Sequence, residues 1–382
     1  MSRTTGSYST STTLGESVRA FVPSPLPPAR PPLAVDAYRD INRTAELALA
    51  RLSGVSGLVP SVDWLLYSAI RKEALMTSQI EGTQATLTDL FDEEAGLTVT
   101  NTDDVEEVSN YLRAFRLVQD QLRRPDGLPI SVRLLCDAHE LLLDGARGAG
   151  KQPGELRRSQ NWIGGTKPGN AVFVPPPPES VTALLSDLEH FIHSDKSGLP
   201  PLVNIALVHA QFETIHPFLD GNGRIGRLLI AALLESCGLL DEPLMYLSGY
   251  LKHHQAEYYQ RLSGIRTDGD WESWVSFFLE GIVAASADAE HCIIAIASLV
   301  ASDRQRLMKS SKAGAASYRL FEQLPMMPRF TVERVKLALD TSFPTANAAV
   351  KILEDLNIVA ETTGQKTNRQ YSYASYIEAL TS

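Results

Sequence analysis

The chain has 382 residues, of which 44% are hydrophobic and 21% charged, and its formal net charge is -10. This length suffices for two or three domains with a sizeable core, and the acidic balance argues against non-specific binding of nucleic acid or membranes by the whole chain. The first thirty residues contain no apolar stretch of signal-peptide type, and the longest apolar runs are too short to span a bilayer. We therefore expect a cytoplasmic protein without a membrane partner.

The N-terminal part begins with a Ser/Thr-rich stretch, Met1–Arg19, which predicts a mobile tail. The proline-rich stretch Phe21–Pro32 follows and predicts an extended arm, because proline favours the polyproline conformation. Gly82 is placed to end one of the helical patterns that come next. Apolar residues at helical spacing predict helices at 36–51, 61–81, 105–122 and 129–143.

The pattern changes between residues 162 and 178. Two short strand-like runs, Trp162–Gly165 and Ala171–Val174, flank the turn residues Thr166–Asn170, which is typical of a β-hairpin. The tetraproline Pro175–Pro178 comes next and cannot lie inside a helix. Helical patterns resume at 180–194, 202–214, 224–235, 256–263 and 271–286, and a further long helix is expected past residue 290.

The C-terminal segment Ser317–Ser382 has an element order of its own. Helices are predicted at Thr331–Leu339 and Pro344–Leu356, and strand-like runs follow at 359–363 and 370–373. Helix, turn, helix and two strands is the order of a winged helix. The segment presents few cations, although binding to DNA requires neutralisation of phosphates. We therefore favour a protein-docking module over a DNA-binding one.

The run His-Pro-Phe-Leu-Asp-Gly-Asn-Gly-Arg-Ile-Gly-Arg, residues 216–227, joins two predicted helices. Residues 221–223 tolerate left-handed backbone, and their N–H groups beside a helix N-terminus form a nest for an anion. Arg224 and Arg227 lie three residues apart on the new helix. Two guanidinium groups beside such a nest suit a polyphosphate.

Two more side chains of this run have the chemistry that a nucleotide site requires. Asp220 offers one hard oxygen ligand, as Mg²⁺ on a nucleotide often has. His216 lies at the opposite end of the loop, and an imidazole is suited to act as a general base. The run therefore indicates a site for nucleotide phosphates and Mg²⁺ next to a base.

These twelve residues resemble the Fic family signature, His-Pro-Phe-x-Asp/Glu-Gly-Asn-Gly-x-x-x-Arg, at every fixed position. The resemblance extends over about residues 60–285. It implies a mainly α fold, a Fic-type helical bundle with a small β-hairpin flap, followed here by a winged-helix domain. The expected regions are an N-terminal arm with an inhibitory helix at 1–100, a catalytic core at 101–288, and a linker helix with the winged helix at 289–382.

The resemblance implies a protein adenylyltransferase, which transfers AMP from ATP to a hydroxyl side chain of a protein. In this role His216 is the base, Asp220 binds Mg²⁺, and Arg227 holds the γ-phosphate. The expected nucleotide-binding residues are Gly221, Asn222, Gly223, Arg224, Ile225, Gly226, Arg227, Gln211, Tyr250 and Tyr258.

A second segment, Thr77–Gly82, resembles the inhibitory motif of the family, Ser/Thr-x-x-x-Glu-Gly/Asn. Thr77 and Glu81 are four residues apart and share a helical face. Glu81 falls in the last turn of its helix, where the helix dipole disfavours an anion by a few tenths to ~1 kcal/mol. A facing cation would remove that penalty, and Arg227 is the natural candidate. The implied mechanism is that Glu81 takes the place of the γ-phosphate.

Several partners and alternatives follow from the same resemblance. The hairpin Trp162–Val174 falls where Fic proteins carry a flap that pairs with the backbone of a protein substrate. Family members also form homodimers, which makes a homodimer an expectation here. One alternative is a DNA-binding regulator whose Fic core senses nucleotides. Another is a Fic transferase that uses a different nucleotide or group, because the loop contacts phosphates and not the base.

Overall fold

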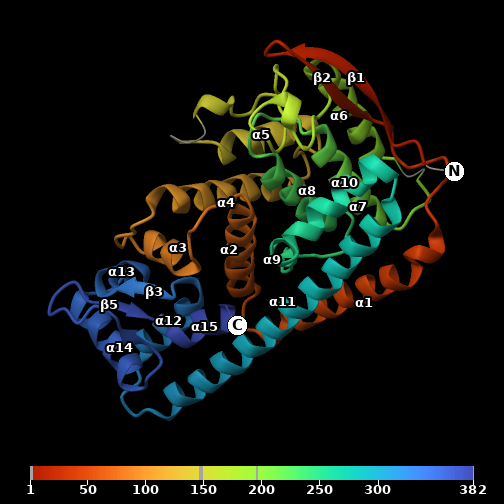
Figure 1. Ribbon diagram of the computed structural model, residues 1–382. Helices are drawn as coiled ribbons and strands as arrows, with labels where there is room; N and C mark the ends of the chain where they lie inside the picture. Colours follow the sequence, from red (N-terminus) through yellow and green to blue (C-terminus); the bar gives the residue numbers. More distant parts are fainter. Residues whose placement is uncertain (1–2, 146–148, 195–196, 382) are drawn as a thin grey trace.

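The computed structural model describes residues 3–145, 149–194 and 197–381. Helices make up most of it, with a two-stranded hairpin near the N-terminus and a three-stranded sheet near the C-terminus (Figure 1). The helices up to residue 309 are α1 (Arg39–Val55), α2 (Val62–Ile80), α3 (Leu87–Glu94), α4 (Thr102–Arg123), α5 (Val132–Leu142), α6 (Pro178–Ile192), α7 (Pro201–Ile215), α8 (Asn222–Ser236), α9 (Leu247–His253), α10 (Gln255–Asp268) and α11 (Trp271–Lys309).

The predicted helices of this region are confirmed, with three differences. The short helices α3 and α9 were not predicted. The patterns at 271–286 and past residue 290 form one continuous helix, α11, which passes through the expected boundary between residues 288 and 289. It runs beside α1 and reaches the C-terminal unit (Figure 1).

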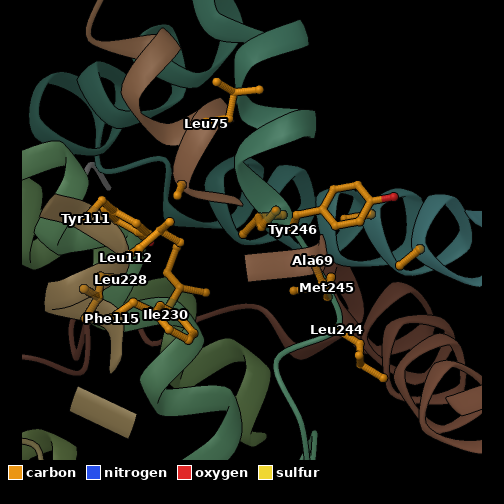
Figure 2. Packing of buried hydrophobic residues seen from close by; sticks show 14 of the residues in the cluster. Ala69, Leu75, Tyr111, Leu112, Phe115, Leu228, Ile230, Leu244, Met245 and Tyr246 are labelled. Atoms are coloured by element: carbon orange, nitrogen blue, oxygen red, sulfur yellow. The ribbon is translucent and has the colours of Figure 1, made fainter. Parts of the chain in front are cut away.

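The core that supports the site lies between α4, α7 and α8. Tyr111 and Phe115 of α4 pack near Leu228 and Ile230 of α8, and all four side chains are buried (Figure 2). Helix α2 contacts both α4 and α9 and is capped at its start by Ser61, whose hydroxyl accepts from the Asp63 N–H at 3.2 Å. Helix α2 also contacts α8, and these contacts hold its C-terminal end next to the N-terminal part of α8.

The expectation of a mobile tail at Met1–Arg19 is wrong for the part of it that the structure describes, residues 3–19. Residues 6–23 form a hairpin of β1 (Gly6–Thr13) and β2 (Glu16–Pro23), paired from Gly6 with Pro23 to Thr13 with Glu16. Leu14 and Gly15 both have positive φ, 51° and 78°, as a tight two-residue hairpin turn requires. The Ser/Thr-rich composition obscured this turn and the buried residues of β2.

The flap at Trp162–Val174 is less regular than expected. One bridge, Ile163 with Phe173, replaces the two predicted strands, and a short 3₁₀ turn at Pro168–Asn170 closes the loop. Gly164 and Gly165 have positive φ, 67° and 75°. Two successive left-handed residues divert the chain from an extended path, so the first strand stops after Ile163.

The C-terminal unit contains the predicted helices and strands in the predicted order, together with a first helix, a short strand and a last helix that were not predicted. Its sheet has the order β3-β5-β4. The elements are α12 (Ala315–Gln323), β3 (Arg329–Thr331), α13 (Val332–Ala338), α14 (Phe343–Asp355), β4 (Ala360–Glu361), β5 (Gln370–Ser372) and α15 (Ala374–Thr381). The winged-helix assignment stays a prediction.

The C-terminal unit is docked on α2 and α3 (Figure 1). Arg329 binds the Asp92 carboxylate with two nitrogens at 2.6 and 3.1 Å. The Ser68 and Tyr376 hydroxyls lie 2.9 Å apart in the buried contact of α2 with α15. The helix with the predicted inhibitory residue therefore touches both the core and the C-terminal unit.

By length and composition alone, α11 could cross a membrane. The apolar runs within it are each too short to span a bilayer, and a single helix of 39 residues was not predicted. In the structure α11 contacts α1, α7, α9, α10 and α15. A third of its most apolar window is buried by the rest of the chain.

Candidate active site

The loop between α7 and α8 is fixed by the side chains that the motif supplies. His216 ends α7 in a left-handed conformation (φ 51°), and Gly221 precedes α8 in another (φ 75°). The Asn222 side chain spans the loop: its Oδ1 accepts from the Phe218 N–H and its Nδ2 donates to the Phe218 carbonyl, both at 2.8 Å. The Asn222 amide is thus used within the loop, and the backbone N–H groups of the α8 N-terminus are left for an anion.

His139 of α5 supports the same loop and was not singled out in the sequence. Its ring stacks on Phe218 with the centroids 3.8 Å apart. Its Nδ1 accepts from the Gly154 N–H at 3.0 Å, so its Nε2 carries the proton and donates to the Asp220 carbonyl, also at 3.0 Å. Burial lowers the pKa of His139 to about 4, which keeps the ring neutral in this role.

His216 sits at the other end of the loop and is neutral at physiological pH. Burial, reinforced by the Arg157 guanidinium, lowers its pKa to about 4. Arg157 donates its Nε to the His216 carbonyl at 2.8 Å and its Nη2 to the Pro176 carbonyl at 2.6 Å. The Nδ1 of His216 is buried without a hydrogen-bond partner among the described residues. A neutral imidazole with an unused nitrogen is in the state that a proton acceptor requires.

Arg227 is buried and bonded to both predicted inhibitory residues. Its Nε donates to the Thr77 hydroxyl at 2.7 Å, and its Nη2 lies 2.5 Å from Glu81 Oε1 and 3.2 Å from the Thr77 carbonyl. The Arg227 side chain is 2% exposed and that of Glu81 is 35% exposed. Burial opposes ionisation of Glu81, but Arg227, with help from Arg224, lowers the pKa of its carboxyl below the ordinary value.

The Glu81 carboxylate lies against the first turn of α8. A Cβ built on Gly223 would be only 2.4 Å from Glu81 Oε1 and 2.9 Å from Arg227 Nη1. Glu81 therefore occupies the space directly above the helix N-terminus, where a bound anion would contact the backbone N–H groups. Gly223 is needed here because any side chain would displace the carboxylate.

The buried Arg224 and the exposed Asp220 lie next to each other at the loop. Arg224 Nη1 is 3.3 Å from Glu107 Oε2, and its Nη2 is 3.7 Å from Asp220 Oδ1. The Asp220 side chain is 46% exposed and accepts from the Gly221 N–H at 2.6 Å. Among the described residues no group of three or more His, Cys, Asp or Glu could hold a metal. One exposed carboxylate fits Mg²⁺ bound chiefly by nucleotide phosphates and water.

The family models match where the loop and helix α2 lie. Residues 40–120 match the family model "Fic/DOC family N-terminal", and residues 129–234 match the family model "Fic/DOC family". The chain contains Fic/DOC family domains.

Curated relatives are similar over the Fic domain. The protein adenylyltransferase Fic of Drosophila grimshawi is 35% identical over 128 residues, which is 33% of this chain and 24% of that protein. The protein of the same name from Aedes aegypti is 34% identical over 33% of this chain and 23% of its own length. The chain thus matches about a quarter of the length of these relatives.

Solved structures show the fold. A Fic family protein from Desulfovibrio desulfuricans G20 has a TM-score of 0.58 at 21% identity, covering 90% of this chain and 97% of its own. A Fic domain containing signaling protein from Bacteroides thetaiotaomicron VPI-5482 has a TM-score of 0.53 at 21% identity, covering 66% and 97%. The expected mainly helical Fic fold is confirmed.

Ile225, Gly226 and Tyr258 of the Fic domain lie behind the loop. Ile225 is a fully buried core residue. The Gly226 carbonyl and the Tyr258 hydroxyl contact the two nitrogens of His209 at 3.1 and 2.8 Å. A Cβ on Gly226 would meet Glu213 at 2.4 Å. These residues support the α8 N-terminus from inside the core.

Gln211 and Tyr250 are not brought to the loop. Gln211 is buried and donates its amide to the Ser24 carbonyl, just after β2, at 3.0 Å. Tyr250 of α9 packs on His254 and Phe277 and lines a cavity that includes none of the described loop residues. Their nucleotide-binding roles stay predictions.

Glu213 is a further acidic residue near the site that the sequence analysis did not single out. Burial raises the pKa of its carboxyl to about 7, and Glu81 adds to this effect, whereas Arg227 and Arg266 oppose it. Its Oε1 is buried without a partner among the described residues. The spacing in the sequence could have indicated Glu213, since it precedes His216 by three residues and so lies on a neighbouring position of the helix.

Proposed function

We propose that the Fic domain transfers AMP from ATP to a hydroxyl side chain of a protein and that Glu81 holds it inactive. The observation that carries this proposal is the Glu81 carboxylate at the α8 N-terminus, bonded to Arg227 and directly above Gly223. An inhibitory anion at this place implies that an anion of the substrate binds there. The relatives named protein adenylyltransferase support the reaction class.

The chain supplies a base and a charged cradle for the transfer. The acceptor oxygen attacks the α-phosphorus, the bond from that phosphorus to the bridging oxygen breaks, and pyrophosphate leaves. His216 accepts the proton of the acceptor hydroxyl, and its pKa of about 4 keeps it unprotonated before the reaction. Arg224, Arg227 and the N–H groups at the start of α8 stabilise the charge on the phosphates. Asp220 would hold Mg²⁺, which neutralises the leaving pyrophosphate when bound.

Inhibition follows from competition for one guanidinium. Arg227 is 2% exposed and already bound to Thr77 and Glu81, so it contacts a γ-phosphate only after Glu81 withdraws. A bias of about 2–3 kcal/mol toward the closed arrangement would suppress activity roughly 30- to 150-fold.

The partner we propose is a protein segment that lies along the flap. Ile163 and Val172 of the flap are 37% and 81% exposed and offer apolar contacts beside the bridge. A homodimer and a cytoplasmic location without a membrane partner complete the proposal. We assign the C-terminal unit a protein-docking role, and DNA binding is the alternative for it.

The test uses ATP labelled on the α-phosphate, with Mg²⁺, and measures label on the protein. Wild type, Glu81→Gly, and Glu81→Gly with His216→Ala are compared. Strong labelling of the single variant alone is the expected result. Glu93→Gly is the control, because Glu93 is an exposed residue in the last turn of α3 and should leave labelling at the wild-type level.

The same reactions with labelled GTP and UTP separate AMP transfer from transfer of another nucleotide. Absence of label from every nucleotide in a folded Glu81→Gly variant would overturn the proposed function. Labelling of wild type as strong as that of Glu81→Gly would overturn the inhibitory role alone.

A further inference from the structure

We propose that the N-terminal hairpin β1–β2 braces the flap over the active site, with Glu16 and Phe21 as its positioning residues. The acceptor role of the flap rests on the proposed function, whereas the bracing itself does not. The flap here is Trp162–Val174.

The base of the hairpin is anchored to the helices of the Fic domain. The Arg3 guanidinium makes two bonds to the Glu272 carboxylate, at 2.7 and 2.8 Å, and one to the Gly269 carbonyl at 2.7 Å. The Arg3 side chain is 7% exposed. The Thr5 hydroxyl donates to the Arg266 carbonyl at 3.0 Å. Buried, multiply bonded contacts of this kind fix position, unlike isolated surface ion pairs.

The hairpin is also attached to the helix that carries the base. Gln211 of α7 donates to the Ser24 carbonyl, and the Ser24 N–H donates to the Thr5 carbonyl at 2.8 Å. His216 ends the same helix. The hairpin and His216 therefore share one rigid support.

The other part of the hairpin holds the flap at two points. The Glu16 carboxylate accepts from Lys167 Nζ at 2.5 Å and from the Gly169 N–H at 3.0 Å, both in the turn of the flap. The Phe21 N–H donates to the Val174 carbonyl at 3.0 Å, which adds β2 to the outer side of the flap.

The buried ring of Phe173 packs the flap against the hairpin and α10. It lies 6.4 Å from the Phe21 ring, and the Arg266 guanidinium stacks over it at 3.9 Å. Phe173 is 9% exposed, whereas its neighbour Val172 is 81% exposed. The side of the flap that carries Phe173 thus packs against the hairpin and α10. The side that carries Val172 is exposed and can contact a protein acceptor.

The flap has little regular pairing of its own to fix this arrangement. Its backbone pairing is one bridge, Ile163 with Phe173, among the described residues. Without the hairpin, the flap would sample other positions, and an acceptor bound to it would reach His216 less often. We infer that the brace lowers the KM for the protein acceptor and leaves ATP binding unaffected.

Hydrogen exchange of the wild-type protein and three variants tests the brace directly. Glu16→Ala removes the contact with the turn of the flap, and Lys167→Ala removes part of the same contact from the flap side. Phe21→Ala removes the ring contact with Phe173 and keeps the backbone bond to Val174. We expect amides of residues 163–174 to exchange about fivefold faster or more in each variant, while those of α8 are unchanged. Glu333→Ala removes an exposed ion pair with Lys336 on α13 and is the matched control for Glu16→Ala. Unchanged flap exchange in all three variants would overturn the proposal.

The kinetic arm uses the Glu81→Gly background, labelled ATP and dephosphorylated β-casein as an extended, hydroxyl-rich acceptor. We expect the KM for casein to rise about fivefold in Glu16→Ala, with the KM for ATP and kcat nearly unchanged. An equal rise of both KM values would contradict a positioning role. If the Glu81→Gly variant does not label casein, this result counts against the proposed function. The hydrogen-exchange experiment then decides whether the hairpin braces the flap.

Discussion

The guanidinium of Arg227 bonds two residues at the C-terminal end of α2. Thr77 contributes its hydroxyl and its carbonyl, and Glu81 contributes its carboxylate. Burial disfavours the charge, yet Glu81, Tyr258 and Glu213 raise the pKa of Arg227 above its ordinary value, so it stays cationic. Because Thr77 bonds Nε and Glu81 bonds Nη2, the two contacts to α2 can be removed one at a time.

Thr77→Val replaces the hydroxyl by a methyl group of similar size and leaves the buried Nε without its acceptor. An unsatisfied buried donor costs about 1–3 kcal/mol, so we expect a lower Tm in differential scanning calorimetry. Self-labelling should rise above wild type but stay below that of Glu81→Gly, since Glu81 still holds Nη2. Thr214→Val is the control, because that buried hydroxyl donates to the Ala210 carbonyl of its own helix at 2.8 Å and makes no hydrogen bond with α2 or α8 within the described part of the chain. Equal Tm values for Thr77→Val and wild type would contradict this account.

Glu213→Gln tests whether the buried carboxyl near Arg227 is neutral. Burial raises its pKa to about 7, whereas an unfolded Glu titrates near ~4.3. Between these values the folded chain keeps a proton that the unfolded chain has lost, so this group's contribution to stability falls as pH rises through that range. Glutamine keeps the shape and does not titrate.

The stability difference between wild type and Glu213→Gln should therefore depend on pH. At pH 5 we expect nearly equal Tm values. At pH 8 the variant should be more stable by about 1–3 kcal/mol, seen as a Tm higher by about 2–5 °C. A difference that is the same at both pH values would show that Glu213 does not titrate in this range.

At this scale the sequence predicted the residues that lie in one contiguous run and not those that meet them in space. His216, Asp220, Arg224 and Arg227 fall within twelve positions, so their proximity follows from chain connectivity. The support from His139 and Arg157 depends on where α5 and the loop after it are packed. Their residue types carry no signal, since a lone histidine or arginine is compatible with many environments.

Helix α8 has a left-handed glycine at each end, and the two glycines differ in their surroundings. Gly221 (φ 75°) precedes its first residue, and Gly238 (φ 65°) follows its last turn. A Cβ on Gly221 would lie 3.1 Å from Leu142 Cδ2, whereas a Cβ on Gly238 would have no neighbour within 4 Å. Substitutions of these two glycines therefore distinguish the cost of backbone strain alone (Gly238) from the cost of strain together with a close contact (Gly221).

Gly238→Ala should cost about 1–2 kcal/mol, the usual cost of a left-handed residue other than glycine. Gly221→Ala should cost more, since the loop must also shift away from Leu142, and it should abolish labelling in the Glu81→Gly background. Chemical denaturation and the labelling assay measure the two effects. Equal stability of the two variants would mean that the loop accommodates the Cβ without cost.

The elements were predicted best where the periodicity is long and amphipathic. Helices α1, α4 and α6 are of this kind. The hairpin β1–β2 was missed because β1 consists largely of Ser and Thr and because the hairpin is stabilised by contacts with the flap and with α7, α10 and α11. A two-stranded hairpin is marginal alone, so local sequence could not reveal it.

On the scale of the whole molecule, the C-terminal unit and the Fic domain share α11 and meet again at α2 and α3. Tyr373 donates to Asp303 of α11 at 2.6 Å, and Tyr376 lies against Ser68 of α2. Helix α11 continues across the expected boundary at residue 288 and links the Fic domain to the C-terminal unit. Because the two parts are coupled in this way, unfolding of one should be accompanied by unfolding of the other.

We expect the full chain to unfold in one cooperative transition. All four tryptophans lie before residue 275, so their fluorescence reports on the Fic domain, whereas far-UV circular dichroism reports on both parts. The two thermal transitions should coincide in wild type.

In Asp92→Ala and Arg329→Ala the docking pair, whose side chains are 17% and 13% exposed, is broken at a cost of ~1–3 kcal/mol. The double variant should cost less than the sum of the single ones, because both remove the same contact. Fluorescence and dichroism transitions that separate already in wild type would show that the C-terminal unit unfolds independently, and additive losses would show that the pair contributes nothing to its docking.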